Sequence, residues 1–198
     1  MDAIDILKKY WGYTSFRLKQ KEVINSIINN KDTLALLPTG GGKSICFQVP
    51  AILQKGICIV ISPLISLMEE QTRYLKSKGI KSIAISSVMN KNQIETALTN
   101  CIYGGFKFLY LSPEKLRDQN VKDKINEMNV NLIAVDEAHC ISEWGHNFRP
   151  SYRLINEIRE LKKNTPVLAL TATANKDVIR DIEENLNFSE KNLIQSSF

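Results

Sequence analysis

The stretch Leu34-Ala35-Leu36-Leu37-Pro38-Thr39-Gly40-Gly41-Gly42-Lys43-Ser44 decides the fold class, because an apolar run leads directly into three glycines, a lysine and a serine. The apolar run has the character of a buried strand, and residues from about Lys43 to Leu53 have that of a helix. Glycines at such a junction let backbone N–H groups converge on phosphate oxygens, where a Cβ would collide. The helix start adds its positive dipole end. The segment therefore predicts a phosphate-binding loop.

The residues of this loop are expected to bind ATP and Mg²⁺. Lys43 can reach the β- and γ-phosphates, and the Ser44 hydroxyl can bind Mg²⁺. The general pattern is G-x-x-x-x-G-K-[ST], and its first position here is Leu37 instead of glycine. The alternative is a glycine-rich turn that merely links two elements. The predicted nucleotide-binding residues are Thr39, Gly40, Gly41, Gly42, Lys43 and Ser44.

Short apolar runs alternate with amphipathic helical stretches along the whole chain. Several runs are almost continuously hydrophobic, as in Ile57-Cys58-Ile59-Val60-Ile61, which is typical of strands buried on both faces of a parallel sheet. Leu64, Leu67, Met68 and Leu75 form one helical stripe that ends near Gly79, and Thr173 is a possible cap for the last helix. The pattern predicts a doubly wound α/β fold with a mainly parallel sheet flanked by helices. The predicted strands are Thr33–Leu37, Ile57–Ser62, Ser82–Ser86, Lys107–Leu111, Asn131–Val135 and Val167–Thr171.

Two acidic residues, Asp136 and Glu137, follow the buried run Leu132-Ile133-Ala134-Val135. Carboxylates at the end of a buried strand are costly unless a cation or hydrogen bonds receive them. In a parallel sheet the carboxyl ends of the strands line the ligand crevice, so this pair can meet the phosphate loop there. Asp136 is then the candidate Mg²⁺ partner opposite Ser44, and Glu137 the candidate base for the attacking water. The alternative is a solvated acidic turn.

Composition narrows the class of protein without deciding it. A net charge of +5 permits a nucleic-acid partner but does not require one. No run approaches the roughly 18 apolar residues of a membrane span, and the start of the chain is unlike a signal peptide. Cys46, Cys58, Cys101 and Cys140 lack metal-site spacing, so we expect free thiols, a reducing compartment and no zinc.

Six motifs, taken in order, resemble those of superfamily 2 helicases, and the stretch from His139 to Pro150 resembles the aromatic-rich loop of RecQ-family DNA helicases. The resemblance runs from about Tyr10 to Phe198. It implies a RecA-like motor domain that uses ATP and Mg²⁺ to move 3′ to 5′ along DNA. The motifs are Phe16-Arg17-x-x-Gln20, Pro38–Ser44, Ser62-Pro63-Leu64, Ser112-Pro113-Glu114, Asp136-Glu137-Ala138-His139 and Thr171-Ala172-Thr173.

The resemblance assigns further roles to residues outside the phosphate loop and the acidic pair. Tyr13, Arg17 and Gln20 match the segment around adenine, with Gln20 bonding the edge of the base. From the residues alone, the favoured interpretation of Gln20 is instead an exposed position on an amphipathic helix. Lys43, Asp136 and Glu137 match the catalytic residues. The positions that match DNA-contacting or DNA-coupling segments are Trp144, His146, Phe148, Arg149, Ser62, Pro63, Thr171 and Thr173.

The chain departs from the family pattern at two places. Leu18-Lys19 stands where the family usually has Pro-Gly, which bears little on adenine binding because neither side chain is expected to touch the ligand. Asn147 replaces a usual Asp in the aromatic-rich loop, so the strength of coupling to DNA is open.

We expect residues 1–198 to form a single ATP-binding motor domain and, as a fragment, to be monomeric and nearly inactive. The partners implied are single-stranded and duplex DNA and a second RecA-like domain. That second domain, a zinc region and a winged helix are not expected within these residues. The expected location is the cytoplasm, with the nucleoid, in a bacterium or the nucleus in a eukaryote. A DEAH-box RNA helicase, a non-catalytic nucleic-acid-binding module and a small-molecule kinase remain alternatives.

Overall fold

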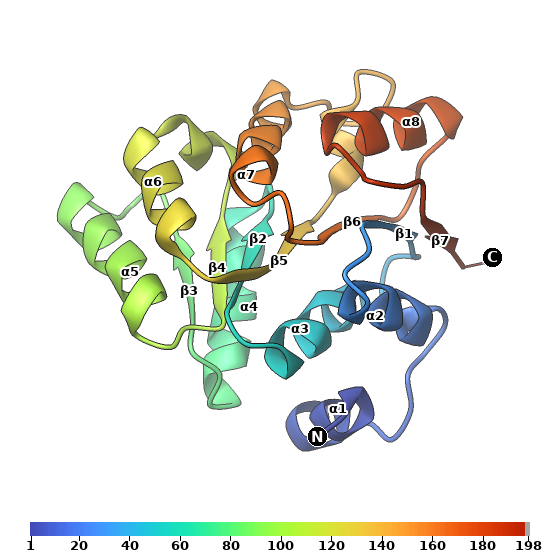
Figure 1. Ribbon diagram of the computed structural model, residues 1–198, viewed down its shortest axis with the longest axis horizontal. Coiled ribbons are helices and arrows are strands. Elements are labelled where there is room, and N and C mark those ends of the chain that lie inside the picture. Colours follow the sequence, from blue (N-terminus) through green and yellow to red (C-terminus); the bar gives the residue numbers. More distant parts are fainter. Residues whose placement is uncertain (197–198) are drawn as a thin grey trace.

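Seven short aliphatic segments form one parallel sheet in the computed structural model, which describes residues 1–196. The predicted domain end at Phe198 lies outside the described residues. Strands and helices alternate along the chain (Figure 1). The elements are α1 (Ala3–Trp11), α2 (Gln20–Ile28), β1 (Thr33–Leu36), α3 (Lys43–Leu53), β2 (Ile57–Ile61), α4 (Ile65–Ser77), β3 (Ser82–Ile85), α5 (Lys91–Tyr103), β4 (Phe108–Leu111), α6 (Gln119–Glu127), β5 (Val130–Val135), α7 (Ile155–Leu161), β6 (Val167–Thr171), α8 (Lys176–Asn185) and β7 (Leu193–Gln195).

The strands lie in the order β3-β4-β2-β5-β6-β1-β7, and every neighbouring pair is parallel. This confirms the predicted doubly wound α/β class, and each of the six predicted strands is present within a residue or two of its expected ends. The seventh strand, β7, was not predicted. It has only three residues, Leu193–Gln195, and none of them is buried, so its apolar run is too short to mark a strand.

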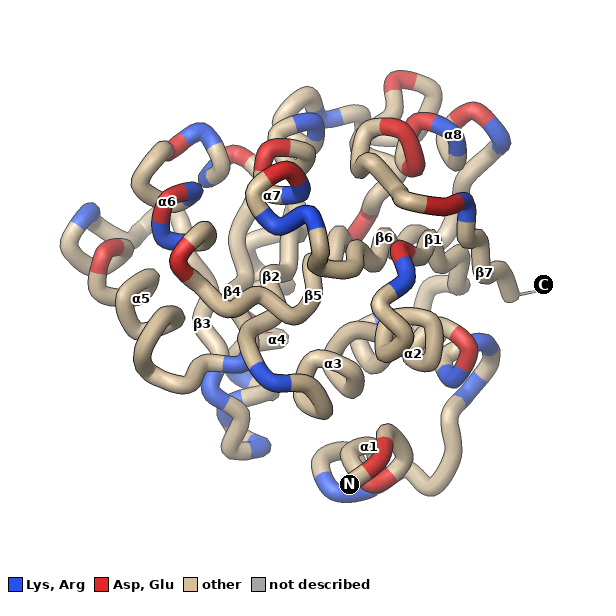
Figure 2. The backbone as a smooth tube through the Cα atoms, in the orientation of Figure 1, with Lys and Arg blue, Asp and Glu red and all other residues tan. Residues whose placement is uncertain are grey.

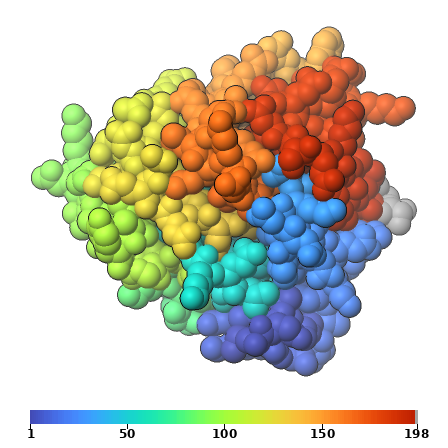
Figure 3. Space-filling view, viewed as in Figure 1, coloured from blue at the N-terminus to red at the C-terminus, as the bar shows by residue number. Residues whose placement is uncertain are grey.

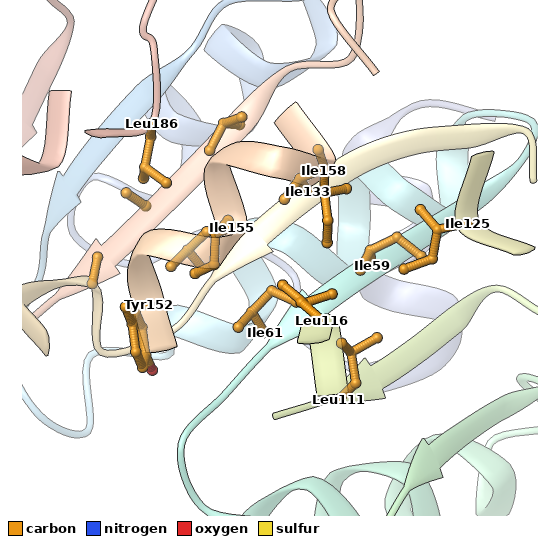
Figure 4. Close-up of a cluster of buried hydrophobic side chains, with 14 of the residues drawn as sticks. Ile59, Ile61, Leu111, Leu116, Ile125, Ile133, Tyr152, Ile155, Ile158 and Leu186 are labelled. Atoms are coloured by element: carbon orange, nitrogen blue, oxygen red, sulfur yellow. The ribbon is translucent and has the colours of Figure 1, made fainter. Parts of the chain in front are cut away.

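Helices cover both faces of the sheet, so the strands are buried on both sides. On one face, α5, α6, α7 and α8 pack over side chains such as Ile59, Ile133 and Leu111. Figure 4 shows this cluster, with Ile155 and Ile158 of α7 pointing at the strands. On the other face, α2, α3 and α4 cover a second cluster that includes Phe47, Phe108 and Tyr110 (Figure 1).

The first helix adds a third, smaller layer. Ile6 and Leu7 of α1 pack against Ile24 of α2 and against Ile45 and Val49 of α3. In the space-filling view, the N-terminal segment in dark blue lies against α3 in cyan (Figure 3). The loop between α1 and α2 is thereby held beside the start of α3.

Two details of the predicted helices were wrong. Leu64 was placed in the apolar stripe of α4, but the helix begins at Ile65 and Leu64 is exposed, whereas Met68 and Leu75 are buried as expected. Thr173 was a possible cap for α8, but the cap is Asn175, whose side chain accepts a hydrogen bond from the Val178 N–H. Thr173 lies two residues too early for that bond.

Two predictions from composition can be compared with the structure. All four cysteines are free, as expected, and the structure shows that all four are also buried. Among residues 1–196, no helix combines the length and the apolar character that crossing a bilayer requires.

Candidate functional site: a phosphate loop beside an acidic pair

The phosphate loop joins β1 to α3 and adopts a backbone that depends on glycine. Gly40 and Gly42 have φ values of 78° and 70°, in the left-handed region. A Cβ on Gly41 would lie 2.8 Å from the Pro38 carbonyl oxygen, so that position also excludes a side chain. No side chain caps the start of α3, and its first turn contains no acidic residue. The positive end of the helix therefore faces the loop without a counter-charge, as an anion site requires.

Lys43, the first residue of α3, makes no ion pair within residues 1–196. Its charge acts on Asp136, because the positive Lys43 opposes the rise of the Asp136 pKa. The structure thus brings together the loop and the acidic pair, which are more than 90 residues apart in the sequence.

Asp136 is a partly buried carboxyl at the end of β5. Burial, followed by the charge of Glu137, raises the pKa of Asp136 above its ordinary value. The Glu137 backbone N–H donates to Asp136 Oδ1 at 3.0 Å, and the Ser62 hydroxyl donates to Oδ2 at 3.5 Å. A divalent cation would reverse the desolvation cost, so this carboxyl fits the predicted Mg²⁺ role together with Ser44. Ser44 lies in the first turn of α3, directly after the phosphate loop, and Asp136 is close enough to the neighbouring Lys43 to be affected by its charge.

Glu137 occupies an unusual backbone position for a residue with a side chain. Its φ of 49° and ψ of 45° lie in the left-handed region, which costs free energy for any residue except glycine. The turn directs the carboxylate toward His139, whose Nδ1 lies 3.3 Å from Glu137 Oε2. Such strain is typical of active sites and supports a chemical role for Glu137 rather than a solvated turn.

His139 connects the acidic pair to the next motif. Its Nδ1 lies 2.9 Å from Thr171 Oγ1, and that hydroxyl donates to the Thr173 carbonyl at 3.1 Å. Since the Thr171 proton is committed, His139 Nδ1 must donate, which fixes the tautomer. Burial lowers the pKa of His139, so the ring is neutral at pH 7. Thr171 is buried, and the predicted role of Thr171 and Thr173 in coupling stays a prediction.

The predicted adenine residues line a cavity of about 430 Å³ that is continuous with the phosphate loop. Arg17 lies over the Tyr13 ring, with its guanidinium carbon 5.4 Å from the ring centroid. Gln20 is buried, so it is not the exposed helix position that was the alternative. Its Nε2 donates to the carbonyls of Gly41 and Gly42 at 3.3 and 3.1 Å, and its Oε1 accepts from the Arg17 N–H. Adenine recognition by Gln20 stays a prediction and requires exchange of these bonds.

Sequence reasoning missed one wall of this cavity. Gln48 of α3 and Gln71 of α4 line it, and both meet the buried Tyr110: Gln48 Nε2 donates to the Tyr110 hydroxyl at 3.4 Å, and that hydroxyl donates to Gln71 Oε1 at 2.9 Å. The isolated polar Gln48 inside the apolar stretch from Ile45 to Ala51 was the available signal.

The aromatic-rich loop lies beside the acidic pair. The Arg149 Nη1 donates to the Pro63 carbonyl at 3.3 Å, which joins this loop to the Ser62-Pro63 motif. Arg149 and Phe148 line a hollow of about 460 Å³ together with Glu137 and His139. The catalytic candidate Glu137 and three of the DNA-coupling candidates, Pro63, Phe148 and Arg149, therefore share one space.

Asn147 also lines that hollow, whereas Trp144 and His146 line a separate one together with Thr173. Trp144 is 69% exposed, and His146 is exposed as well. The loop is anchored at its base by Ser142, whose hydroxyl donates to Asp181 of α8 at 2.6 Å and accepts from the Trp144 N–H at 3.2 Å. An exposed indole on an anchored loop is available for base stacking, which stays a prediction.

Ser62 and Pro63 lie at the end of β2, and their side chains are less accessible than the DNA-contact prediction assumed. Ser62 is buried with its hydroxyl on Asp136, and Pro63 is half-buried. Any contact of Ser62 with a nucleic-acid backbone would have to come from its main chain, so this role also stays a prediction.

The fold and this loop define a RecA-like, phosphate-loop nucleotide-binding domain. The model of the DEAD/DEAH box helicase family matches residues 17–182, and the chain belongs to that family. It is 45% identical over 177 residues to the probable ATP-dependent DNA helicase RecS of Bacillus subtilis, covering 89% of this chain and 35% of that protein. It is 41% identical to the ATP-dependent DNA helicase RecQ of Haemophilus influenzae, covering 99% of this chain and 32% of that one. The resemblance to RecQ helicases is therefore confirmed.

Solved structures agree on the fold. The DNA-bound DUF1998 helicase MrfA superposes with a TM-score of 0.77 at 15% identity, covering 99% of this chain and 29% of that one. The chain spans about a third of the length of the curated relatives above.

Proposed function

We propose that this chain is the first motor domain of a helicase that couples ATP hydrolysis to 3′-to-5′ translocation on single-stranded DNA and to duplex unwinding. The carrying observation is the hollow that Glu137 and His139 share with Phe148 and Arg149. A base that activates water and a loop that reads DNA occupy one space, so a shift of the loop would be felt at the base. The direction of movement rests on the resemblance to RecQ helicases alone.

Four residues carry the proposed chemistry. Lys43 stabilises charge on the phosphates, Asp136 and Ser44 hold Mg²⁺, and Glu137 takes a proton from the attacking water. The metal supplies charge neutralisation on the phosphate oxygens. The neutral His139 holds Glu137 and Thr171 together, which links the base to the segment after β6.

Full activity is proposed to need a second motor domain. In comparable NTPases, an arginine from a partner domain raises the rate about 10³–10⁵-fold. We therefore propose that residues 1–198 alone, as a monomer, bind ATP–Mg²⁺ but hydrolyse it very slowly and do not unwind DNA.

The test is the ATPase rate of the full-length protein with single-stranded DNA, with RNA and without nucleic acid. Trp144→Ala and Arg149→Ala should lose DNA stimulation and keep the basal rate, whereas Tyr103→Ala, at an equally exposed aromatic remote from the loop, should resemble the wild type. Stimulation by RNA alone would indicate an RNA helicase. ATP binding without turnover would indicate a non-catalytic module, and no stimulation at all would contradict the role of the loop.

A further inference from the structure

The basic residues of the chain are unevenly distributed. Residues 71–94 contain Arg73, Lys76, Lys78, Lys81 and Lys91 and no acidic residue. This segment alone carries as much positive charge as the net charge of the whole chain, which is +5. The rest of the chain therefore carries equal numbers of basic and acidic residues, and the excess charge lies in this one segment of the sequence.

Four of these residues lie around the C-terminal end of α4, where the neighbouring Tyr74 lines the predicted adenine cavity, and are here called the α4 patch: Arg73, Lys76, Lys78 and Lys81. All four are exposed, and none makes an ion pair within residues 1–196. Figure 2 shows blue segments without red around the lower end of α4. Charges left unpaired at this density are available to a polyanion.

Local contacts hold part of the patch in place. The Lys78 ammonium lies 5.3 Å from the centroid of the Tyr74 ring, and Lys81 Nζ donates to the Gly104 carbonyl at 3.0 Å. Two of the four side chains are therefore partly ordered before any partner binds, which lowers the entropy that binding would cost.

The patch is separate from the proposed single-strand path. The helix α4 follows the Ser62-Pro63 motif directly and has 13 residues, so its two ends are roughly 20 Å apart at 1.5 Å per residue. Glu69 and Glu70 are exposed on the helix between the two ends. Their charges interrupt a continuous path for a phosphate backbone from the motif to the patch.

We propose that the α4 patch binds the phosphate backbone of duplex DNA outside the motor cleft. Duplex DNA carries one charge per about 1.7 Å of axis, which is the density that four clustered cations match best. The proposal rests on the proposed function for its DNA partner. Exposed lysines and an arginine suit sequence-independent contact, because they meet phosphates rather than base edges.

The experiment measures the affinity of the 198-residue chain for a blunt 20-base-pair duplex and for an oligothymidine, by anisotropy without ATP at several salt concentrations. The patch variant combines Arg73→Gln, Lys76→Gln and Lys78→Gln. The matched control combines Lys8→Gln, Lys9→Gln and Lys191→Gln, which removes the same charge from exposed positions. The control also removes one cation–ring contact, as the patch variant does, because the Lys9 ammonium lies 5.1 Å from the centroid of the Tyr10 ring.

The patch variant should bind the duplex roughly 10-fold more weakly near 0.1 M salt, with a salt slope smaller by about 2 to 3, whereas the control should stay within twofold of the wild type. Equal losses in the patch and control variants would overturn the proposal. So would a patch variant that binds duplex normally but loses binding to phosphatidylserine vesicles. Trp144→Ala separates the failure of this proposal from the failure of the proposed function. If Trp144→Ala loses oligothymidine binding while the patch variant binds the duplex normally, the proposed function stands and the patch proposal is wrong.

Discussion

Buried polar groups have opposite surroundings at the two ends of the sheet. At the amino ends of the strands, the carboxylate of Asp32 accepts hydrogen bonds from Arg159 at 2.7 Å, from the Val167 N–H at 2.9 Å, and from the N–H and hydroxyl of Ser189 at 2.9 and 3.0 Å. At the carboxyl ends, Glu137 has a left-handed backbone and Asp136 has a pKa raised by burial.

Lysines show the same contrast. Lys107, at the amino end of β4, donates from Nζ to the carbonyls of Ala51, Gln54 and Gly56, which satisfies all three of its protons near the end of α3. Lys43, at the other end of α3, makes no ion pair among the described residues. A cation whose protons are all used stabilises the fold, whereas one held without an ion pair is available to a ligand.

Structural and functional polar groups in this molecule therefore differ in how fully partners within the chain satisfy them. At the amino ends, the charged groups of Asp32 and Lys107 are saturated by partners within the chain, so their removal should lower stability. Asn131 Oδ1, at the start of β5, is an exception, because this buried acceptor has no partner among the described residues. Groups at the carboxyl ends are strained or incompletely paired, so their removal should lower activity and leave stability unchanged or improved.

The largest effect on stability is expected from Asp32→Ala. The substitution leaves the buried Arg159 guanidinium without its partner, and breaking such a pair costs about 3–5 kcal/mol of unfolding free energy. Urea unfolding measures the loss, and ATP affinity of the folded fraction should not change. Asp177→Ala, which removes an exposed pair with Arg180, is the control and should change stability by less than about 1 kcal/mol. Similar stability losses in the two variants would contradict the comparison.

Lys43→Ala should give the opposite result. Removing the cation that faces the phosphates should lower DNA-stimulated turnover of the full-length protein by about 10²–10³-fold. The unfolding midpoint in urea should be that of the wild type, because the ammonium pairs with no carboxylate. An Ala variant of Lys21, which is exposed, should be normal in both assays. A large loss of stability in Lys43→Ala would assign this lysine to the structural class.

Gly42→Ala tests how tightly the phosphate loop is built. The new methyl group would lie 2.4 Å from Gln20 Nε2 and would sit at a φ of 70°, so we expect a loss of about 1–2 kcal/mol in stability together with weaker ATP binding. Gly40→Ala is the matched control, since it has a φ of 78° but no atom within 4 Å of its added Cβ. The difference between the two variants measures the Gln20 contact, and a zero difference would show that Gln20 yields freely.

The smallest effect is a gain of stability in Asp136→Asn. Because the folded pKa is raised, the carboxyl loses stabilising free energy as pH rises from its ordinary pKa near 3.9 through its folded pKa. The amide avoids that loss, so the variant should be more stable than the wild type at pH 7, with the difference shrinking toward pH 3.5. Unfolding curves at the two pH values measure this. A variant that is less stable at pH 7 would place Asp136 with the structural groups.

Much of the nucleotide site could be predicted from sequence because its signals are local. The glycine-rich loop and the buried run that ends at Asp136 are each recognisable within a window of about ten residues. The strand pattern was then sufficient to place both at the same edge of the sheet. The groups that saturate the other end could not be predicted. Asp32 meets Arg159 across 127 residues, and such a pair leaves no periodic pattern.

Local pattern also failed where contacts are tertiary or elements are short. Gln20 lies on an amphipathic helix, and the helical periodicity alone would allow its side chain to be exposed. In the structure it is buried, because the phosphate loop packs over it and accepts its hydrogen bond. The strand β7 has three residues and is recognised only because β1 offers its edge for pairing. Asn175 competes with Thr173 as a helix cap, and the bond to Val178 decides between them.

The most direct test of the central claim is Glu137→Gln in the full-length protein, assayed for ATP affinity, DNA-stimulated turnover and urea unfolding. A glutamine keeps the size and backbone of the residue but cannot take a proton from water. We predict that turnover falls by about 10²–10⁴-fold while ATP affinity and unfolding free energy stay at wild-type values. Normal turnover, or a loss of turnover explained by a loss of stability, would contradict the claim that the polar groups at the carboxyl ends of the strands serve catalysis.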